Sequence, residues 1–268
     1  MRGSLLMRVL GKARAATVIA TLCAPLITLR AQSAPVAIPP LAAQADSLFR
    51  LGDAVGSLTR ANEGVRRNPS DYASLWRAAR SEIMLGIIEG DRAIIEGHYA
   101  RATALARRAV ALQPGDTAGH FWLAAVLGRR ALRADFRTGL PLASEAYIEA
   151  RRVLVIDSLH AGAHEILGRL HQEVRKLPSV VRVLAGLLSG LEVIRNASWQ
   201  ASEWHLRRAM ALDPSAVLPH ADLALLYLRM GRRADAEREV QQLERMPRRT
   251  PADAFFQGDA RKRLAHTP

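Results

Sequence analysis

Three histidines lie close together in the sequence and could bind a metal ion. His160, His164 and His171 are spaced at i, i+4 and i+11, which places them near one face of a helix. Neutral imidazoles at i and i+4 are a common zinc arrangement, and Glu165 or Glu173 could serve as a further ligand. However, Glu165 projects about 100° away from His164 around a helix, and the chain contains no H-E-x-x-H pattern.

The histidines are better explained by packing. His120, His164 and His220 each lie three residues before a leucine, within similar local sequences. These are positions where the repeat described below normally places a large packing residue. We therefore expect packed imidazoles with no metal and no cofactor, and we keep a zinc site at His160, His164 and His171 as an alternative hypothesis.

A second group of residues could grasp a peptide. Trp76 and Phe121 occupy equivalent positions in their local sequences, and arginines and glutamates recur one to two turns further along. An arginine beside an aromatic ring can pair with carboxylates and stack on rings. The alternative for Trp76 is packing against a neighbouring helical hairpin. The predicted binding surface consists of Trp76, Arg80, Phe121, Arg129, Glu165, Arg169 and Glu173.

Residue types that would support catalysis are missing. Cys23 is the only cysteine, so the chain has no disulfide framework and no thiol nucleophile outside its first 31 residues. The sequence also lacks a G-x-S-x-G motif and a phosphate-binding glycine loop. We therefore expect a binding protein and not an enzyme.

The elements that must position these residues form a repeat. The clearest copy, residues 201–243, has a helical stripe ending at Asp213-Pro214, a second helix, a turn at Gly231 and a third helix. Apolar residues three and four apart lie on one helical face, proline stops a helix, and glycine tolerates the turn. The composition, with 49% hydrophobic but only 5% aromatic residues, suits closely stacked helices better than a β-sandwich.

The junction in which a helix, a proline or aspartate stop and a second helix follow one another recurs along the sequence. This recurrence predicts an all-α array of antiparallel helix pairs over residues 39–245. A C-terminal helix and tail should follow over residues 246–268, capped by Asp253, with Phe255 and Phe256 closing the stack. The predicted helix pairs cover residues 39–68, 71–112, 117–157, 161–212 and 217–245.

The junctions resemble the tetratricopeptide repeat. The order of motifs is similar to that of the regulator of microtubule dynamics family: YASLWRAAR at 72–80, GHFWLA at 119–124, HEILGRLHQEV at 164–174, KLPSVVRVLAGLLSG at 176–190, then LRRAMALDP and PHADLALLY. This resemblance implies a superhelical array that binds a protein or peptide partner. The Lys/Asn pairing of the tetratricopeptide carboxylate clamp is absent, so recognition of a chain terminus is not implied.

The first residues are typical of a secretory leader. Basic residues precede an apolar run over residues 15–29, and small residues follow it. We expect a signal peptide over residues 1–31, cleaved near 31–34, and a short linker over 32–38. An exported protein of the bacterial periplasm or envelope is therefore predicted, and the family's microtubule role is not transferred. An uncleaved membrane anchor is the alternative.

Charge and one apolar segment bear on the partners. The net charge is +13, but the leader carries five basic residues and no acidic one. Elsewhere, arginines alternate with acidic residues along helices, as is typical of a solvated face and not of a nucleic-acid site.

Residues 177–194 are apolar almost all round. We expect a helix wedged into the stack there, with an exposed apolar patch for a partner or a membrane surface as the alternative.

Overall fold

The structure is a computed structural model that describes residues 40–189 and 192–267. The predicted leader and linker, residues 1–31 and 32–38, lie outside these described residues. Within the described ranges the chain folds into thirteen helices: α1 (Pro40–Arg50), α2 (Ala54–Arg67), α3 (Tyr72–Ile88), α4 (Arg92–Leu112), α5 (Thr117–Arg133), α6 (Phe136–Ile156), α7 (Ala161–Lys176), α8 (Ser179–Ser189), α9 (Glu192–Asn196), α10 (Trp199–Leu212), α11 (Val217–Arg229), α12 (Arg233–Arg245) and α13 (Asp253–His266).

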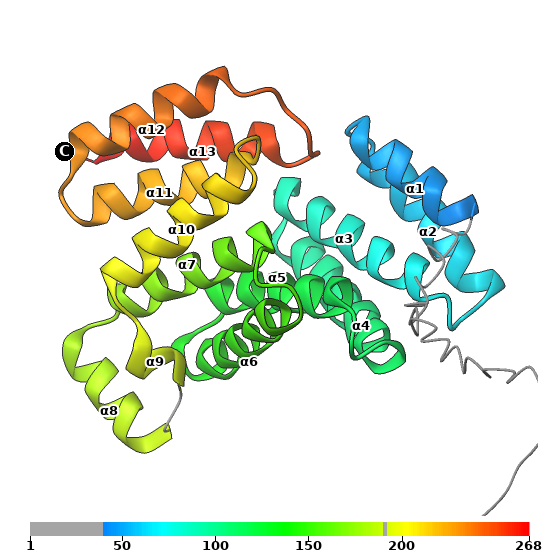
Figure 1. Cartoon of the computed structure of the whole chain (residues 1–268), viewed down its shortest axis with the longest axis horizontal. Helices are drawn as coiled ribbons and strands as arrows, with labels where there is room; N and C mark the ends of the chain where they lie inside the picture. The colour runs from blue at the N-terminus through cyan, green and yellow to red at the C-terminus, as the bar shows by residue number, and fades with distance from the viewer. Residues whose placement is uncertain (1–39, 190–191, 268) are drawn as a thin grey trace, which may run out of the picture. The chain divides into compact units, whose positions relative to one another are not determined.

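The helices pack as consecutive pairs, which confirms the predicted all-α repeat array. The pairs are α1 with α2, α3 with α4, α5 with α6, α7 with α10, and α11 with α12 (Figure 1). The last helix, α13, turns back and packs on α11 and α12. The first helices α3, α5 and α7 also contact one another in order, so they form one continuous inner layer.

Helix ends follow from local side chains. Five helices begin after an aspartate whose carboxylate accepts a hydrogen bond from a backbone N–H in the first turn, which satisfies an otherwise unpaired donor. These aspartates are Asp53, Asp71, Asp91, Asp116 and Asp135. Gly231 has φ of 70°, so the left-handed turn predicted between α11 and α12 is present.

Small residues let paired helices approach closely. The core contains fully buried alanines such as Ala79, Ala124 and Ala224, with Leu75 and Leu223 beside them on the same helices. At the α7–α10 crossing, a Cβ added to Gly168 would lie 2.7 Å from Leu206 Cγ. Ser202 also donates to the Gly168 carbonyl over 2.7 Å. The two helices of this pair therefore leave no space for another helix between them.

The prediction of one wedged helix over residues 177–194 is wrong in one respect, because the segment forms two helices, α8 and α9. Val193 and Ile194 of α9 are buried, and this helix contacts α6 and α7. On α8, Val180 and Val183 are 63% and 60% exposed. The close α7–α10 crossing leaves no room for an insertion between those two helices.

The C-terminal helix also differs from the prediction in its details. Asp253 is the first residue of α13 and does not cap it. Its carboxylate instead accepts hydrogen bonds from the Arg249 and Thr250 N–H groups, at 2.7 and 2.8 Å, and so stabilises the preceding turn. Phe256 is buried as expected, whereas Phe255 is 46% exposed, because successive residues of a helix face different directions.

Candidate functional site

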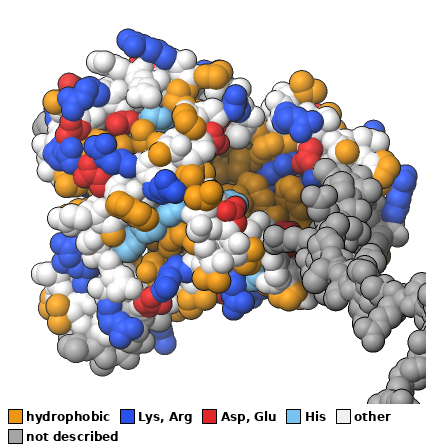
Figure 2. Space-filling view, viewed as in Figure 1, with side chains coloured by type: hydrophobic (Ala, Val, Ile, Leu, Met, Phe, Trp, Pro, Cys, Tyr) orange, Lys and Arg blue, Asp and Glu red, His pale blue; other side chains and the backbone are white. Residues whose placement is uncertain are grey.

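A cavity of about 370 Å³ opens on the inner layer of the array. Its walls come from α3, α5, α7 and α11, from the turn before α11, and from the segment that leads into α13. Figure 2 shows a recess in which hydrophobic side chains gather, with charged side chains among them. The apolar lining includes Ile83, Met84, Ile87, Leu132 and Leu170.

The cavity brings together six of the seven residues of the predicted binding surface. Arg80 comes from α3, Phe121 and Arg129 from α5, and the remaining three from α7: Glu165, Arg169 and Glu173. They converge because first helices of successive repeats lie side by side, so equivalent positions face the same space. Their role in binding stays a prediction.

Trp76 is the exception, because it does not line the cavity. The Arg77 guanidinium carbon lies 3.8 Å from the centre of the indole ring, and that of Arg80 lies 5.4 Å from it. Trp76 therefore packs against two arginines of its own helix, which is not the contact with a neighbouring hairpin that the packing alternative predicts.

Arg80 is held by a carboxylate from the first helix. Asp46 accepts two hydrogen bonds from Arg77, at 2.8 and 2.6 Å, and forms an ion pair with Arg80 at 2.9 Å. Burial alone would raise the pKa of Asp46, but the two arginines outweigh it and lower the pKa. Burial lowers the pKa of Arg80 to about 10, although Asp46 opposes this shift. One carboxylate thus serves two buried guanidinium groups.

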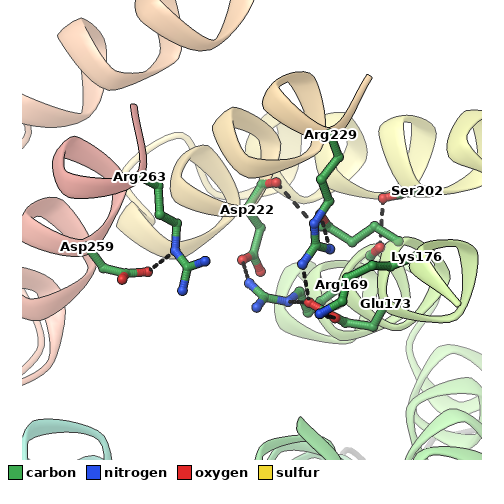
Figure 3. A network of polar contacts seen from close by, with 10 residues as sticks. Arg169, Glu173, Lys176, Ser202, Asp222, Arg229, Asp259 and Arg263 are labelled. Atoms are coloured by element: carbon green, nitrogen blue, oxygen red, sulfur yellow. Dashed lines mark hydrogen bonds and ion pairs between the residues drawn. The ribbon is translucent and has the colours of Figure 1, made fainter. Parts of the chain in front are cut away.

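An ion-pair network joins α7 to α11 on another wall (Figure 3). Arg169 pairs with Asp222 and also with Glu173, the latter at 2.9 Å. Arg229 donates to Glu173 at 2.9 Å and to Gln172 at 3.1 Å. Burial raises the pKa of Glu173, but Arg169 and Arg229 outweigh it, so the pKa is lowered and this carboxylate stays ionised. The network fixes the orientation of α7 side chains toward the cavity.

Glu165 behaves differently from the other acidic residues of the cavity. Burial and the neighbouring Asp222 carboxylate raise the pKa of Glu165 well above its ordinary value. Among the residues that the structure describes, Asp222 Oδ2 is buried and has no hydrogen-bond donor. Burial and this neighbouring carboxylate therefore both favour the protonated form of Glu165.

Arg129 occupies the opposite situation. Within the described part of the chain, no carboxylate lies at ion-pair distance from Arg129, and its guanidinium carbon lies 5.1 Å from the centre of the Phe256 ring. Arg249 lies beside the same cavity and donates to the Ser215 hydroxyl. The cavity therefore contains arginine side chains whose charge is not matched by an acidic partner.

The predicted histidine alternatives separate clearly. His160 accepts a hydrogen bond from the Ala163 N–H, and its ring centre lies 4.7 Å from that of Phe121. His164 instead meets His205, with their Nδ1 atoms 2.9 Å apart, and His171 stacks on His205. Among residues 40–189 and 192–267, no three potential ligand side chains are placed to hold a metal ion. The zinc alternative at His160, His164 and His171 is therefore wrong in its geometry.

The recurring histidines are packing residues, as expected. His120, His164 and His220 are only 4%, 4% and 1% exposed. Each histidine contacts the second helix of its own pair. His120 contacts Glu149, and His220 contacts Glu239. His164 contacts His205 at the equivalent position.

Several cavity residues are not part of the predicted surface. Asp222 follows Ala221, which is equivalent to Glu165 and Phe121, so a search one position further along each first helix would have found it. Phe49 comes from α1 in the first helix pair, and Arg249 and Phe256 come from the C-terminal segment after the repeats. Only the folded chain brings them to the same cavity.

The fold is shared with one solved helical-repeat structure described below, and two further structures show weaker similarity. A thermophilic tetratricopeptide repeat protein of Thermus thermophilus, TTC0263, is 21% identical over 85% of this chain and 96% of its own, with a TM-score of 0.58. MamA of Desulfovibrio magneticus RS-1 is 16% identical over 78% and 96%, with a TM-score of 0.44. YrrB, described as a tetratricopeptide repeat protein with an unusual peptide-binding site, is 12% identical over 84% and 92%, with a TM-score of 0.41.

No protein with a curated description matches the sequence. The family model described as regulator of microtubule dynamics protein 1-3, however, matches residues 41–267, which span the array from α1 through α13. This match confirms the resemblance found in the motifs, and the chain belongs to this family.

Proposed function

We propose that this protein is a non-enzymatic scaffold that holds a short segment of another polypeptide in the cavity of its inner layer. The observation that carries the proposal is the cavity itself, with apolar walls and a few charged groups that point into one space. Binding sites commonly combine such walls with a few polar groups that fix the orientation of the ligand. At about 370 Å³ the cavity can take several side chains of an extended segment.

The rigidity of the walls supports this role. Arg169, Glu173 and Arg229 are fixed by mutual ion pairs, and Arg80 is fixed by Asp46. Side chains that are already ordered lose little conformational entropy when a ligand binds. A preorganised surface of this kind suits recognition, and the polypeptide is the partner we propose.

A variant that fills the cavity tests the proposal. Gly128 lines the cavity, and a Cβ added there would meet no atom within 4 Å. A side chain at position 128 therefore starts in open space, so Gly128→Leu places bulk in the cavity, and leucine also favours the helix. Gly258→Leu is the matched control, because Gly258 lies within α13, has equally open space at its Cβ and does not line the cavity.

The assay is capture of polypeptides from envelope extract, with the purified protein as bait and a photo-crosslinker at Leu132. We expect a crosslinked polypeptide with wild type and with Gly258→Leu, and its loss with Gly128→Leu. Equal crosslinking by Gly128→Leu would contradict a role for the cavity.

We further propose that the protein acts in the cell envelope after export. This rests on the basic and apolar leader in the sequence, residues 1–31. Fractionation of cells followed by N-terminal sequencing is the test. A mature chain beginning near residue 32 to 35 in the envelope fraction would support export, and an intact N-terminus in the cytoplasmic fraction would contradict it.

Membrane-surface association is a second candidate, favoured by the exposed valines of α8. Val180 and Val183 are 63% and 60% exposed, and Lys176 lies just before this helix. Every helix within residues 40–189 and 192–267 is too short or too polar to cross a bilayer. Flotation with anionic vesicles should fall with Val180→Ser but not with Val155→Ser, a control at a valine that is 82% exposed on α6. No flotation of wild type would remove this candidate.

A further inference from the structure

Four arginines line the cavity, and one of them, Arg169, pairs with Asp222 and Glu173. The other three lie on α3, on α5 and in the segment before α13, and we refer to Arg80, Arg129 and Arg249 as the cavity arginines. None has a carboxylate of its own among the described residues. Arg129 has no ion-pair partner there, Arg249 donates to a serine hydroxyl, and Arg80 shares Asp46 with Arg77. Two nitrogens of Arg80, Nε and Nη2, are buried without a described hydrogen-bond partner.

The acidic groups of the same cavity, apart from Glu165 and one oxygen of Asp222, already have partners among the described residues. Asp222 and Glu173 pair with Arg169, and Arg229 adds a second cation to Glu173. The remaining two, Asp213 and Asp253, accept hydrogen bonds from the turns that contain them. A group that is fully hydrogen-bonded gains little from a ligand, whereas an unmatched charge beside an apolar wall gains much.

Glu165 is the remaining acidic group of the cavity. Burial and the neighbouring Asp222 carboxylate raise the pKa of Glu165 well above its ordinary value, so both favour its neutral form. A cationic ligand would face the three cavity arginines, whereas an anionic ligand would be attracted by them. The unmatched charge of the cavity is therefore positive.

We propose that the bound segment carries an aspartate or glutamate side chain between aliphatic residues, with its carboxylate on Arg129. This inference rests on the proposed function and names the chemistry of its ligand. The planar guanidinium of Arg129 can donate two parallel hydrogen bonds to a carboxylate while it remains against the ring of Phe256. Ile83, Met84 and Ile87 line the adjacent wall and accept the aliphatic neighbours.

Selection from a random peptide library displayed on phage tests both the site and its chemistry. The purified wild-type protein is the bait, and clones that also bind Gly128→Leu are discarded. The surviving peptides should be enriched in one acidic residue flanked by leucine, isoleucine or valine. Absence of any clone sensitive to Gly128→Leu would overturn the proposed function together with this inference. Cavity-dependent clones enriched in lysine or arginine, or in no charged residue, would overturn the inference alone.

Binding by the selected peptide is then compared across matched variants. Arg129→Gln should weaken binding about tenfold or more, the range expected for loss of one charged hydrogen-bonding partner. Arg130→Gln is the control, because the neighbouring Arg130 is half-buried on the same helix but donates to Thr103. Equal loss in both variants would overturn the assignment to Arg129.

A change in the peptide provides a second discrimination. Replacing the acidic residue of the peptide by its amide should reproduce the loss caused by Arg129→Gln.

Discussion

Replacing Gly168 with alanine places a methyl group where α7 and α10 touch. The added Cβ would lie 2.7 Å from Leu206 Cγ and 3.2 Å from the Leu206 backbone nitrogen. The first contact is shorter than carbon atoms tolerate, and Leu206 is fully buried, so it has no free space into which to move. The two helices must separate or Leu206 must leave its favoured rotamer.

The expected cost combines two opposing effects. Overpacking of a close-packed interior costs about 1–3 kcal/mol, while alanine in place of a mid-helix glycine returns up to about 1 kcal/mol. With the full gain subtracted, the net loss should be up to about 2 kcal/mol. A domain of this size loses about 2–4 °C in Tm for each kcal/mol. Because α7 carries Glu165 and Arg169, the same displacement should also weaken ligand binding.

The comparison that isolates this effect is Gly128→Ala, because a Cβ at Gly128 meets no atom within 4 Å. This variant should gain up to about 1 kcal/mol from helix propensity alone. Urea unfolding followed by circular dichroism measures both. If Gly168→Ala is as stable as Gly128→Ala, the close α7–α10 approach does not constrain the fold and the reasoning fails.

Three further predictions concern buried titratable groups. Asp46→Ala leaves Arg77 and Arg80 without their shared carboxylate and should cost about 3–5 kcal/mol of unfolding free energy in urea; a loss below about 1 kcal/mol would contradict the ion-pair assignment. Burial raises the pKa of Glu165, so the wild type should lose stability as the pH rises through that pKa. In urea titrations between pH 5 and 9, Glu165→Gln should not show this decline. If the unfolding free energies of both proteins change with pH in the same way, Glu165 does not hold a buried proton. Burial lowers the pKa of His205 to about 3, so the stability of the wild type should fall as the pH drops below about 6.5. Thermal melts of His205→Gln should show a smaller fall between pH 7 and pH 5. An equal fall in both proteins would mean that another group causes the acid sensitivity.

The helix register could be read from the sequence because its signals are local. Proline and aspartate stops, the apolar stripe and the glycine turn act within a few residues, and each is realised, as at Gly231. Positions equivalent between repeats then bring Phe121, Arg129 and Glu165 to one cavity. This part of the site follows from repeat geometry alone.

The remaining features depend on contacts between distant segments. Trp76 has the same register as Phe121, but its ring is covered by Arg77, whose position is set by Asp46 on another helix. Arg249 and Phe256 reach the cavity because α13 folds back onto α11. No local pattern encodes such returns.

The segment between α7 and α10 has a consequence for the order in which the chain folds. In four helix pairs the partners are joined by two or three residues, whereas here residues 177–198 separate them. Closing this longer connection costs about 2 kcal/mol more in chain entropy than closing a three-residue turn. The α7–α10 hairpin should therefore form after its neighbours and open before them, so that the array behaves as an early-folding N-terminal block and a C-terminal block that join at this step. Hydrogen exchange should show the boundary as weaker protection of the α7 and α10 amides.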